Sequence, residues 1–128
     1  MSLGGGASPA LATAVRNSIA SGITYTVAAG NSNASAAFYS PARAKAAITV
    51  GPPPAPTTRP VTPTTAHSWA CSPPGSSITV GWHTSDTATA TLFGTSMAAP
   101  HAAGAAALEL TSRPSASPAT VSTILILR

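Results

Sequence analysis

The chain has 128 residues and a mass of 12.5 kDa, which fits one small domain or a piece of a larger one. Only 6% of the residues are charged, and Asp86 and Glu109 are the only acids, which argues against a catalytic carboxylate pair and against a carboxylate cage for calcium or magnesium. Cys71 is the only cysteine, so an intrachain disulfide and a zinc–cysteine cluster are excluded.

The net charge of +4 comes from six bases that are scattered along the chain. A nucleic-acid-binding protein usually gathers its basic residues on one face, so we expect no nucleic-acid partner. No apolar run approaches the roughly 18 residues that a membrane-spanning helix needs. The first residues contain neither a basic start nor an apolar stretch, so the sequence predicts no membrane partner and no signal peptide.

In the N-terminal third, Ser8 and Pro9 are typical of a helix start, because serine caps helices and proline suits the first helical position. An apolar stripe at helical spacing follows, and Gly22 suits the end of this helix. The stripe comprises Leu11, Ala14, Val15, Ser18 and Ile19.

Two short apolar runs follow, at residues 23–27 and 46–51, and both are typical of buried strands. A helix that leads into strands of this kind predicts an α/β fold with a parallel sheet.

The middle of the chain has a different composition, because residues 52–74 hold eight of the thirteen prolines. Proline cannot donate a hydrogen bond within a sheet, so this segment is predicted to be extended or irregular and not a central strand. After it, the alanine-rich residues 94–110 predict a helix, and Ser117 and Pro118 predict the start of a short terminal helix.

The strongest chemical signal is the run Gly94-Thr95-Ser96-Met97-Ala98-Ala99-Pro100-His101, which places a serine among small residues at a helix start. Backbone N–H groups at a helix start can bind an oxyanion, so Ser96 is a candidate nucleophile. Taken alone, the pattern also fits a serine that only caps the helix.

Together with two other motifs, this run resembles the subtilisin-like serine proteases (peptidase S8), in particular their proteinase-K-like and secreted actinobacterial members. The other motifs are Ser2-Leu3-Gly4-Gly5-Gly6 and Val27-Ala28-Ala29-Gly30-Asn31, with Tyr39-Ser40-Pro41-Ala42 and Ile48-Thr49-Val50-Gly51 after it. The three motifs stand in the family's order, and the serine motif is very specific. The resemblance implies an α/β fold, with residues 1–128 forming an incomplete part of a subtilisin-like parallel-sheet domain.

The resemblance also implies roles for individual residues and a polypeptide substrate. Ser96 matches the nucleophile of a serine endopeptidase, and Asn31 matches the side-chain donor to the oxyanion. Ser2, Leu3 and Gly4 match the strand edge that pairs with the substrate backbone. The wall of the pocket for the residue before the cut corresponds to Ala28, Ala29 and Gly30. The family is mostly extracellular.

The family's aspartate and histidine motifs lie upstream of the Ser-Leu-Gly-Gly segment, and neither occurs in these 128 residues. His67 has no acid near it in sequence, His83 and Asp86 fall in a polar loop, and His101 is rotated about 140° from Ser96 on the helix. Serine is a weak nucleophile without a base, so we expect the isolated chain to be inactive. A complementing N-terminal protease fragment is therefore a candidate partner.

The sequence departs from the family pattern at two further places. Phe93 replaces a residue that is usually serine, and its ring is expected to crowd the oxyanion site. Residues 52–73 do not resemble the family although both flanks do, which suggests a reading-frame slip and its later correction. Ala70 then falls where proteinase-K-like members carry a calcium-binding aspartate, so we expect neither a cofactor nor a bound metal.

Two other interpretations remain open at this point. The chain could be a non-catalytic polypeptide-binding module, with residues 2–6 and 52–74 as the segments that dock another chain. It could also be a catalytically inactive fragment.

Overall fold

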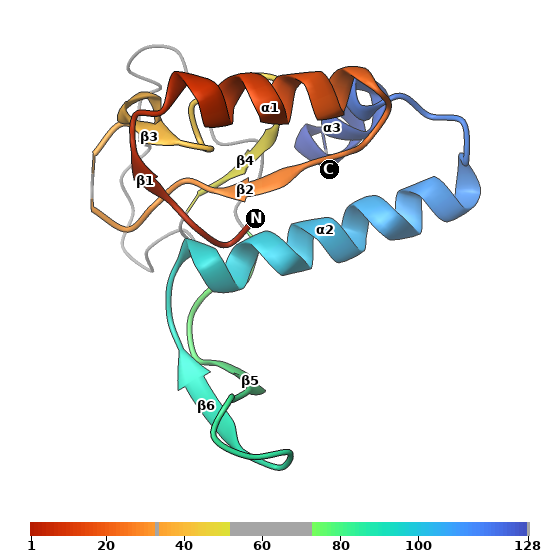
Figure 1. Cartoon of the computed structure of the whole chain (residues 1–128). Coiled ribbons are helices and arrows are strands. Elements are labelled where there is room, and N and C mark those ends of the chain that lie inside the picture. The colour runs from red at the N-terminus through yellow and green to blue at the C-terminus, as the bar shows by residue number, and fades with distance from the viewer. Residues whose placement is uncertain (33, 52–72, 128) are drawn as a thin grey trace.

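Two parallel strands form the centre of the fold, and a helix lies on each side of them (Figure 1). The computed structural model describes residues 1–32, 34–51 and 73–127. Its central strands are β2 (Thr26–Ala28) and β4 (Ile48–Val50), and they pair in parallel with Val27 opposite Thr49. The flanking helices are α1 (Pro9–Ala20) and α2 (Thr95–Ser112). The predicted parallel α/β arrangement is confirmed.

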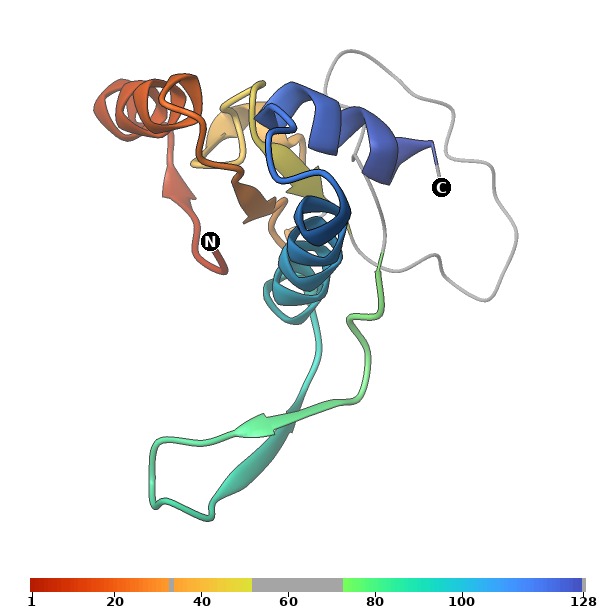
Figure 2. The same cartoon turned by 90° about the vertical axis from the view of Figure 1, so that its right-hand side faces the viewer.

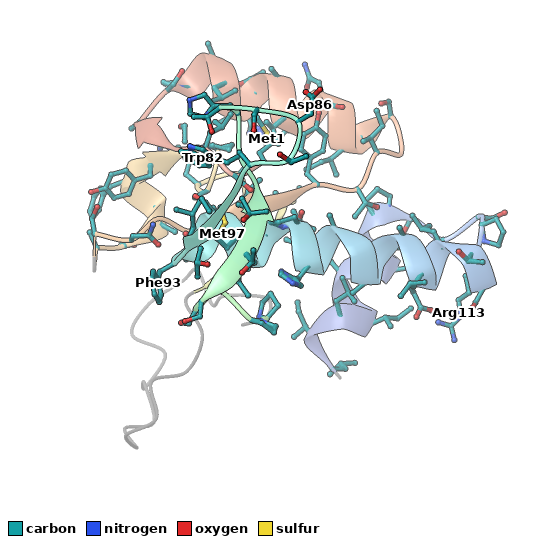
Figure 3. All side chains as sticks on the ribbon, turned by 90° about the horizontal axis from the view of Figure 1, so that it is seen from below. Met1, Trp82, Asp86, Phe93, Met97 and Arg113 are labelled. Atoms are coloured by element: carbon teal, nitrogen blue, oxygen red, sulfur yellow. The ribbon has the colours of Figure 1, made fainter. Side chains whose placement is uncertain are left out.

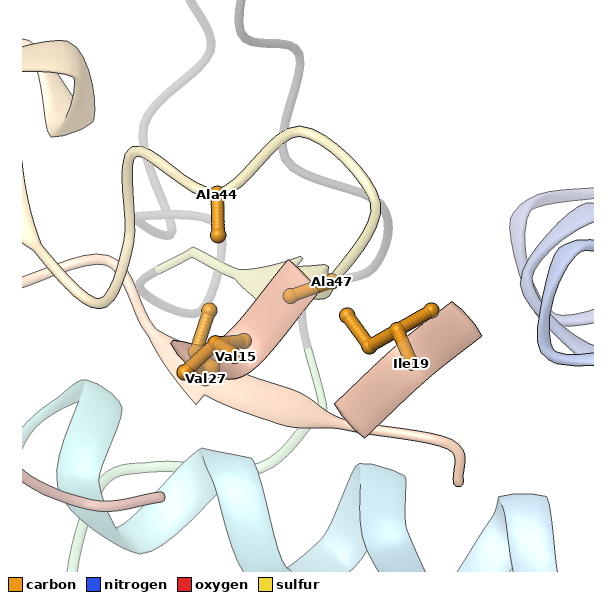
Figure 4. Close-up of a cluster of buried hydrophobic side chains, with 5 residues drawn as sticks. All are labelled: Val15, Ile19, Val27, Ala44 and Ala47. Carbon is orange, nitrogen blue, oxygen red and sulfur yellow. The ribbon is translucent and has the colours of Figure 1, made fainter. Parts of the chain in front are cut away.

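Side chains of the central strands alternate between the two helices, as they do along any strand. Val27 packs on the α1 side with Val15, Ile19, Ala44 and Ala47 (Figure 4). On the opposite face, Ala28 and Val50 pack against three alanines of α2, namely Ala98, Ala99 and Ala102. The small residues on the α2 side allow that helix to lie close to the sheet.

Helix α1 begins as the sequence predicts, because the Ser8 hydroxyl accepts a hydrogen bond from the Leu11 N–H at 3.3 Å and Pro9 is the first helical residue. Gly22 follows the last turn with a φ of +102° and donates its N–H to Ile19 O. A positive φ of this kind suits glycine at a helix end.

The segment before α1 first runs beside strand β2 and then forms a short strand of its own. Met1 O accepts a hydrogen bond from the Ala28 N–H at 3.0 Å, so Met1 runs beside β2. Partial burial of the Met1 amino group lowers its pKa, because it leaves less water around the charged form. The chain then enters β1 (Gly5–Gly6), which pairs antiparallel with β3 (Tyr39–Ser40) just after the 3₁₀ helix η1 (Ala36–Phe38).

Helix α2 is followed by α3 (Pro118–Ile126), which covers the far end of the sheet. Ile48 of β4, Ala106 of α2 and Val121 of α3 form one buried cluster. Near the end of α2, the buried Glu109 pairs with Arg113 one turn later. The predicted alanine-rich helix and the predicted terminal helix are both confirmed.

A hairpin was not predicted from the sequence. Strands β5 (Ile78–Gly81) and β6 (Thr89–Leu92) pair antiparallel with each other and extend away from the sheet and helices (Figure 2). Their turn carries His83 and Asp86, both exposed, as expected for a polar loop. The proline-rich segment 52–74 falls almost wholly outside the described residues, and so does the suggested frame slip.

Candidate active site

The end of β2 and the start of α2 are joined by a group of hydrogen bonds. The Gly30 N–H donates to Thr95 Oγ1 at 3.2 Å, and Asn31 Oδ1 accepts from both the Thr95 N–H at 3.0 Å and the Thr95 hydroxyl at 3.1 Å. One turn further along α2, the Thr26 hydroxyl donates to Ala99 O at 3.1 Å. These bonds hold residues 30–31 against the first turn of α2, although some 64 residues separate them in sequence.

The contacts of Thr95 fix the orientation of the Asn31 amide. A backbone N–H can only donate, so the atom of Asn31 that faces the Thr95 N–H must be the carbonyl oxygen. The Asn31 NH₂ group therefore points away from Thr95, and it has no hydrogen-bond partner among the described residues. Asn31 is exposed, so this NH₂ group is available to an outside acceptor.

Residue 94, directly before Thr95, has to be glycine for two reasons: its backbone conformation and the nearness of Asn31. Its φ is +124°, which residues with a Cβ rarely adopt. A Cβ at this position would also lie only 2.7 Å from Asn31 Nδ2. The absence of a side chain at residue 94 thus allows Asn31 to approach the helix start.

Ser96 is the second residue of α2, and the N-cap of this helix is Gly94, with no side-chain cap. Ser96 is therefore not the capping residue. In the first turn, Thr95 N–H donates to Asn31, while the N–H groups of Met97 and Ala98 donate to Gly94 O. The Ser96 N–H has no partner in the part of the chain that the structure describes. It lies at a helix N-terminus, where the partial charge of the helix is positive.

The N-terminal segment, residues 2–4, also contacts the first turn of α2. The Ser2 hydroxyl donates to Ser96 O at 2.7 Å. Leu3 and Gly4 follow as exposed residues without strand pairing, and β1 begins only at Gly5. The backbone of residues 2–4 is therefore open at its edge. That it pairs with a substrate remains a prediction.

The three residues expected to form a pocket wall differ in exposure. Ala28 and Ala29 are buried, and each packs in a separate apolar cluster, whereas Gly30 is exposed. Their role as a pocket wall stays a prediction, and the side chains of Ala28 and Ala29 already contribute to the core.

The described histidines do not act as partners of Ser96. His101 Nδ1 lies 2.8 Å from Met97 O, within its own helix, and the His83 ring lies beside Trp82 at a centroid distance of 4.8 Å. His67 and Ala70 lie outside the described residues. Phe93 is 68% exposed, so most of its ring surface faces solvent and not the neighbouring groups (Figure 3).

Sequence reasoning missed Thr95 as a member of this site. Its side chain is fully buried and its hydroxyl both accepts and donates a hydrogen bond. A hydroxyl between Gly94 and Ser96 was a visible signal, but the sequence did not show that Gly30 and Asn31 would surround it.

With the site in place, comparisons with known proteins identify the family. The family model described as "Subtilase family" matches residues 1–127. The chain belongs to the subtilase family. Subtilases similar to it include the "Extracellular serine proteinase" of Thermus sp. (strain Rt41A), 54% identical over 98% of this chain, and the "Alkaline serine exoprotease A" of Vibrio alginolyticus, 43% identical over the whole chain.

Solved subtilase structures have the same arrangement. A cold-adapted subtilisin-like serine proteinase superposes over the whole chain with a TM-score of 0.87 and 41% sequence identity. This subtilase chain spans only part of its relatives: 31% of the Thermus protein, 24% of the Vibrio protein and 46% of the cold-adapted proteinase chain. None of the described helices is long and apolar enough to cross a membrane.

Proposed function

We propose that this chain provides the nucleophile and the oxyanion-binding groups of a secreted serine endopeptidase. The observation that carries the proposal is that Asn31 is hydrogen-bonded to Thr95, the residue directly before Ser96, and that Asn31 and Ser96 each have an N–H donor without a partner among the described residues. Two such donors are what a developing oxyanion requires. The Thermus relative is an extracellular serine proteinase, which supports the secreted location.

In this proposal, Ser96 Oγ attacks the carbonyl carbon of the scissile peptide bond. The carbonyl oxygen gains the negative charge and accepts hydrogen bonds from Asn31 Nδ2 and from the Ser96 N–H. The serine proton passes to a histidine base, which then gives it to the leaving amine as the C–N bond breaks. Water hydrolyses the resulting ester and regenerates Ser96.

No histidine in the described part of the chain bonds to Ser96, and the sequence carries neither the aspartate motif nor the histidine motif of the family. His101 is engaged with Met97 O, and His83 is on the projecting hairpin beside Trp82. We infer that the histidine base and the aspartate that orients it come from the preceding part of a subtilase domain, whether it is joined to this chain or is a separate polypeptide.

One face of α2 suggests where that part docks. The helix is apolar on nearly all sides, yet Ala103, Gly104, Ala107 and Leu108 are exposed, Leu108 at 74%. A helix that is apolar all round is normally buried. The exposed side borders an open groove of about 630 Å³ between α2 and strand β5. Since more than half of the cold-adapted proteinase chain lies outside the match, the missing part of such a domain is the occupant that we propose.

The substrate would be a polypeptide held at its backbone. Residues 2–4 offer an exposed, unpaired backbone edge that is tied to Ser96 through Ser2. An extended peptide that adds to such an edge would lie beside the nucleophile.

The experiment is a peptidase assay on the full chain, alone and after refolding together with the part of the Thermus proteinase domain that precedes the matched region. We expect no turnover from the chain alone and turnover from the mixture. Ser96→Ala should abolish it, and Asn31→Leu should lower kcat by about 10² to 10³. Turnover that survives Ser96→Ala would contradict the proposal. Peptide binding without any turnover would favour a non-catalytic binding module.

A further inference from the structure

The nucleophile stands on a helical turn that lacks one of its backbone hydrogen bonds. In an α-helix the carbonyl of residue i accepts from the N–H of residue i+4, so Ser96 O should accept from residue 100. Residue 100 is proline, which has no N–H. The helix nevertheless continues through Pro100 from Thr95 to Ser112.

The Ser2 hydroxyl occupies the position of the missing donor. It lies 2.7 Å from Ser96 O, a good distance for an O–H···O hydrogen bond. A proline ring inside a helix also crowds the carbonyl four residues earlier, which tilts that carbonyl outward. An outward carbonyl is accessible to a donor from another segment, and here that segment is 94 residues away in sequence.

We propose that Ser2 is a positioning residue whose side chain replaces the N–H that Pro100 lacks and thereby fixes the backbone of Ser96. Ser96 carries both the attacking Oγ and the N–H that is proposed to bind the oxyanion. A shift of the Ser96 backbone therefore moves both of these groups together. The Ser2 backbone belongs to the exposed edge proposed for substrate, so the same residue links that edge to the nucleophile. This role rests on the proposed function of Ser96.

The arrangement predicts a coupling between two substitutions. Ser2→Ala should leave Ser96 O without a donor, whereas Pro100→Ala restores a backbone N–H at residue 100. The Ser2→Ala change should therefore be harmful with proline at position 100 and nearly neutral with alanine there. Ser2→Thr keeps a hydroxyl and is the conservative control, and Ser21→Ala removes another exposed serine hydroxyl that bonds to a helix carbonyl, far from Ser96.

The first test is amide hydrogen exchange of residues 97–99 in the full chain, which needs no activity. Ser2→Ala should speed this exchange by about five- to tenfold, as expected for one lost hydrogen bond. In the Pro100→Ala background the same change should have less than about a twofold effect. Equal effects in both backgrounds would overturn the inference.

The second test uses the enzyme reconstituted with its N-terminal part. Ser2→Ala should lower kcat by about five- to tenfold with little change in KM, and Ser2→Thr should restore it. Suppose that the effect of Ser2→Ala on exchange depends on residue 100 as predicted but kcat is unchanged. The hydrogen bond from Ser2 to Ser96 O would then be only structural, and the positioning role would be overturned. If no activity can be reconstituted, the function proposed for Ser96 fails, while the exchange data still decide whether Ser2 replaces the missing donor.

Discussion

Thr95 holds the candidate site together at the level of single atoms. Its buried hydroxyl accepts from the Gly30 N–H and donates to Asn31 Oδ1. Without the hydroxyl, the Gly30 N–H loses its acceptor and the Asn31 amide loses one of the two contacts that orient it.

Thr95→Val, which keeps the shape but removes the hydroxyl, should lower the free energy of unfolding by about 1 to 3 kcal/mol. Urea unfolding of the full chain measures this change. Thr95→Ser retains the hydroxyl and should lose much less. An equal loss in both variants would show that the hydroxyl is not responsible.

Two glycines of the serine motif region should respond in opposite ways to alanine. Gly94→Ala forces a Cβ to within 2.7 Å of Asn31 Nδ2 at a positive φ, so we expect a loss of about 2 to 4 kcal/mol. Gly104→Ala has open space around its Cβ within a helix, and should stabilise the chain by up to about 1 kcal/mol. Thermal unfolding of both variants tests this contrast, and a stable Gly94→Ala protein would contradict it.

At the scale of elements, the central layers and the hairpin differ in burial. Strands β2 and β4 are buried along their whole length between two helices. The hairpin strands β5 and β6 are at most half-buried, and within the described residues they pair only with each other.

This difference predicts the order of local opening. Backbone amides in β5 and β6 should exchange with solvent at least about ten times faster than those of β4, because the hairpin has few buried contacts. Hydrogen exchange followed by NMR measures both sets in one sample. Similar protection in the hairpin and in β4 would indicate that another surface covers the hairpin.

The helices could be predicted because their end signals are local. Ser8 with Pro9 and Ser117 with Pro118 cap α1 and α3 as expected, and both serine hydroxyls accept from the third residue on. The parallel pair β2 and β4 followed from two apolar runs, although each strand is shorter than its run.

The hairpin could not be predicted in the same way. Its strands do alternate apolar and polar residues, as half-buried strands do, but each strand is only four residues long, so the signal is weak and does not show which segments pair. Likewise, the contact of Asn31 with Thr95 depends on tertiary packing, which spacing in the sequence does not encode. The motif resemblance placed both segments near the site, but the atoms that touch became clear only in the fold.

At the scale of the whole molecule, the exposed apolar side of α2 should be an interface with the rest of a subtilase domain. Gly104→Leu places a large side chain in the groove without a clash inside the chain itself, since nothing lies within 4 Å of a Cβ at this position. It should lower the yield of the one-to-one complex with the N-terminal part of the Thermus proteinase by about tenfold or more.

The matched control is Ala14→Leu, which adds the same kind of side chain to an exposed position on α1. Co-refolding and size-exclusion chromatography give the yield for each variant. An undiminished complex with Gly104→Leu would contradict the interface. So would a wild-type chain that forms only dimers of itself through this groove.

The most direct test of the central claim is the labelling of Ser96 by a fluorophosphonate, followed by intact mass and peptide mapping. This reagent modifies a serine only when a base activates it. The account predicts no label on the full chain alone, and one label, on Ser96, after refolding with the N-terminal part that brings the aspartate and histidine. Label on a different serine, or no label on Ser96 in a folded complex, would contradict the assignment of Ser96 as the nucleophile.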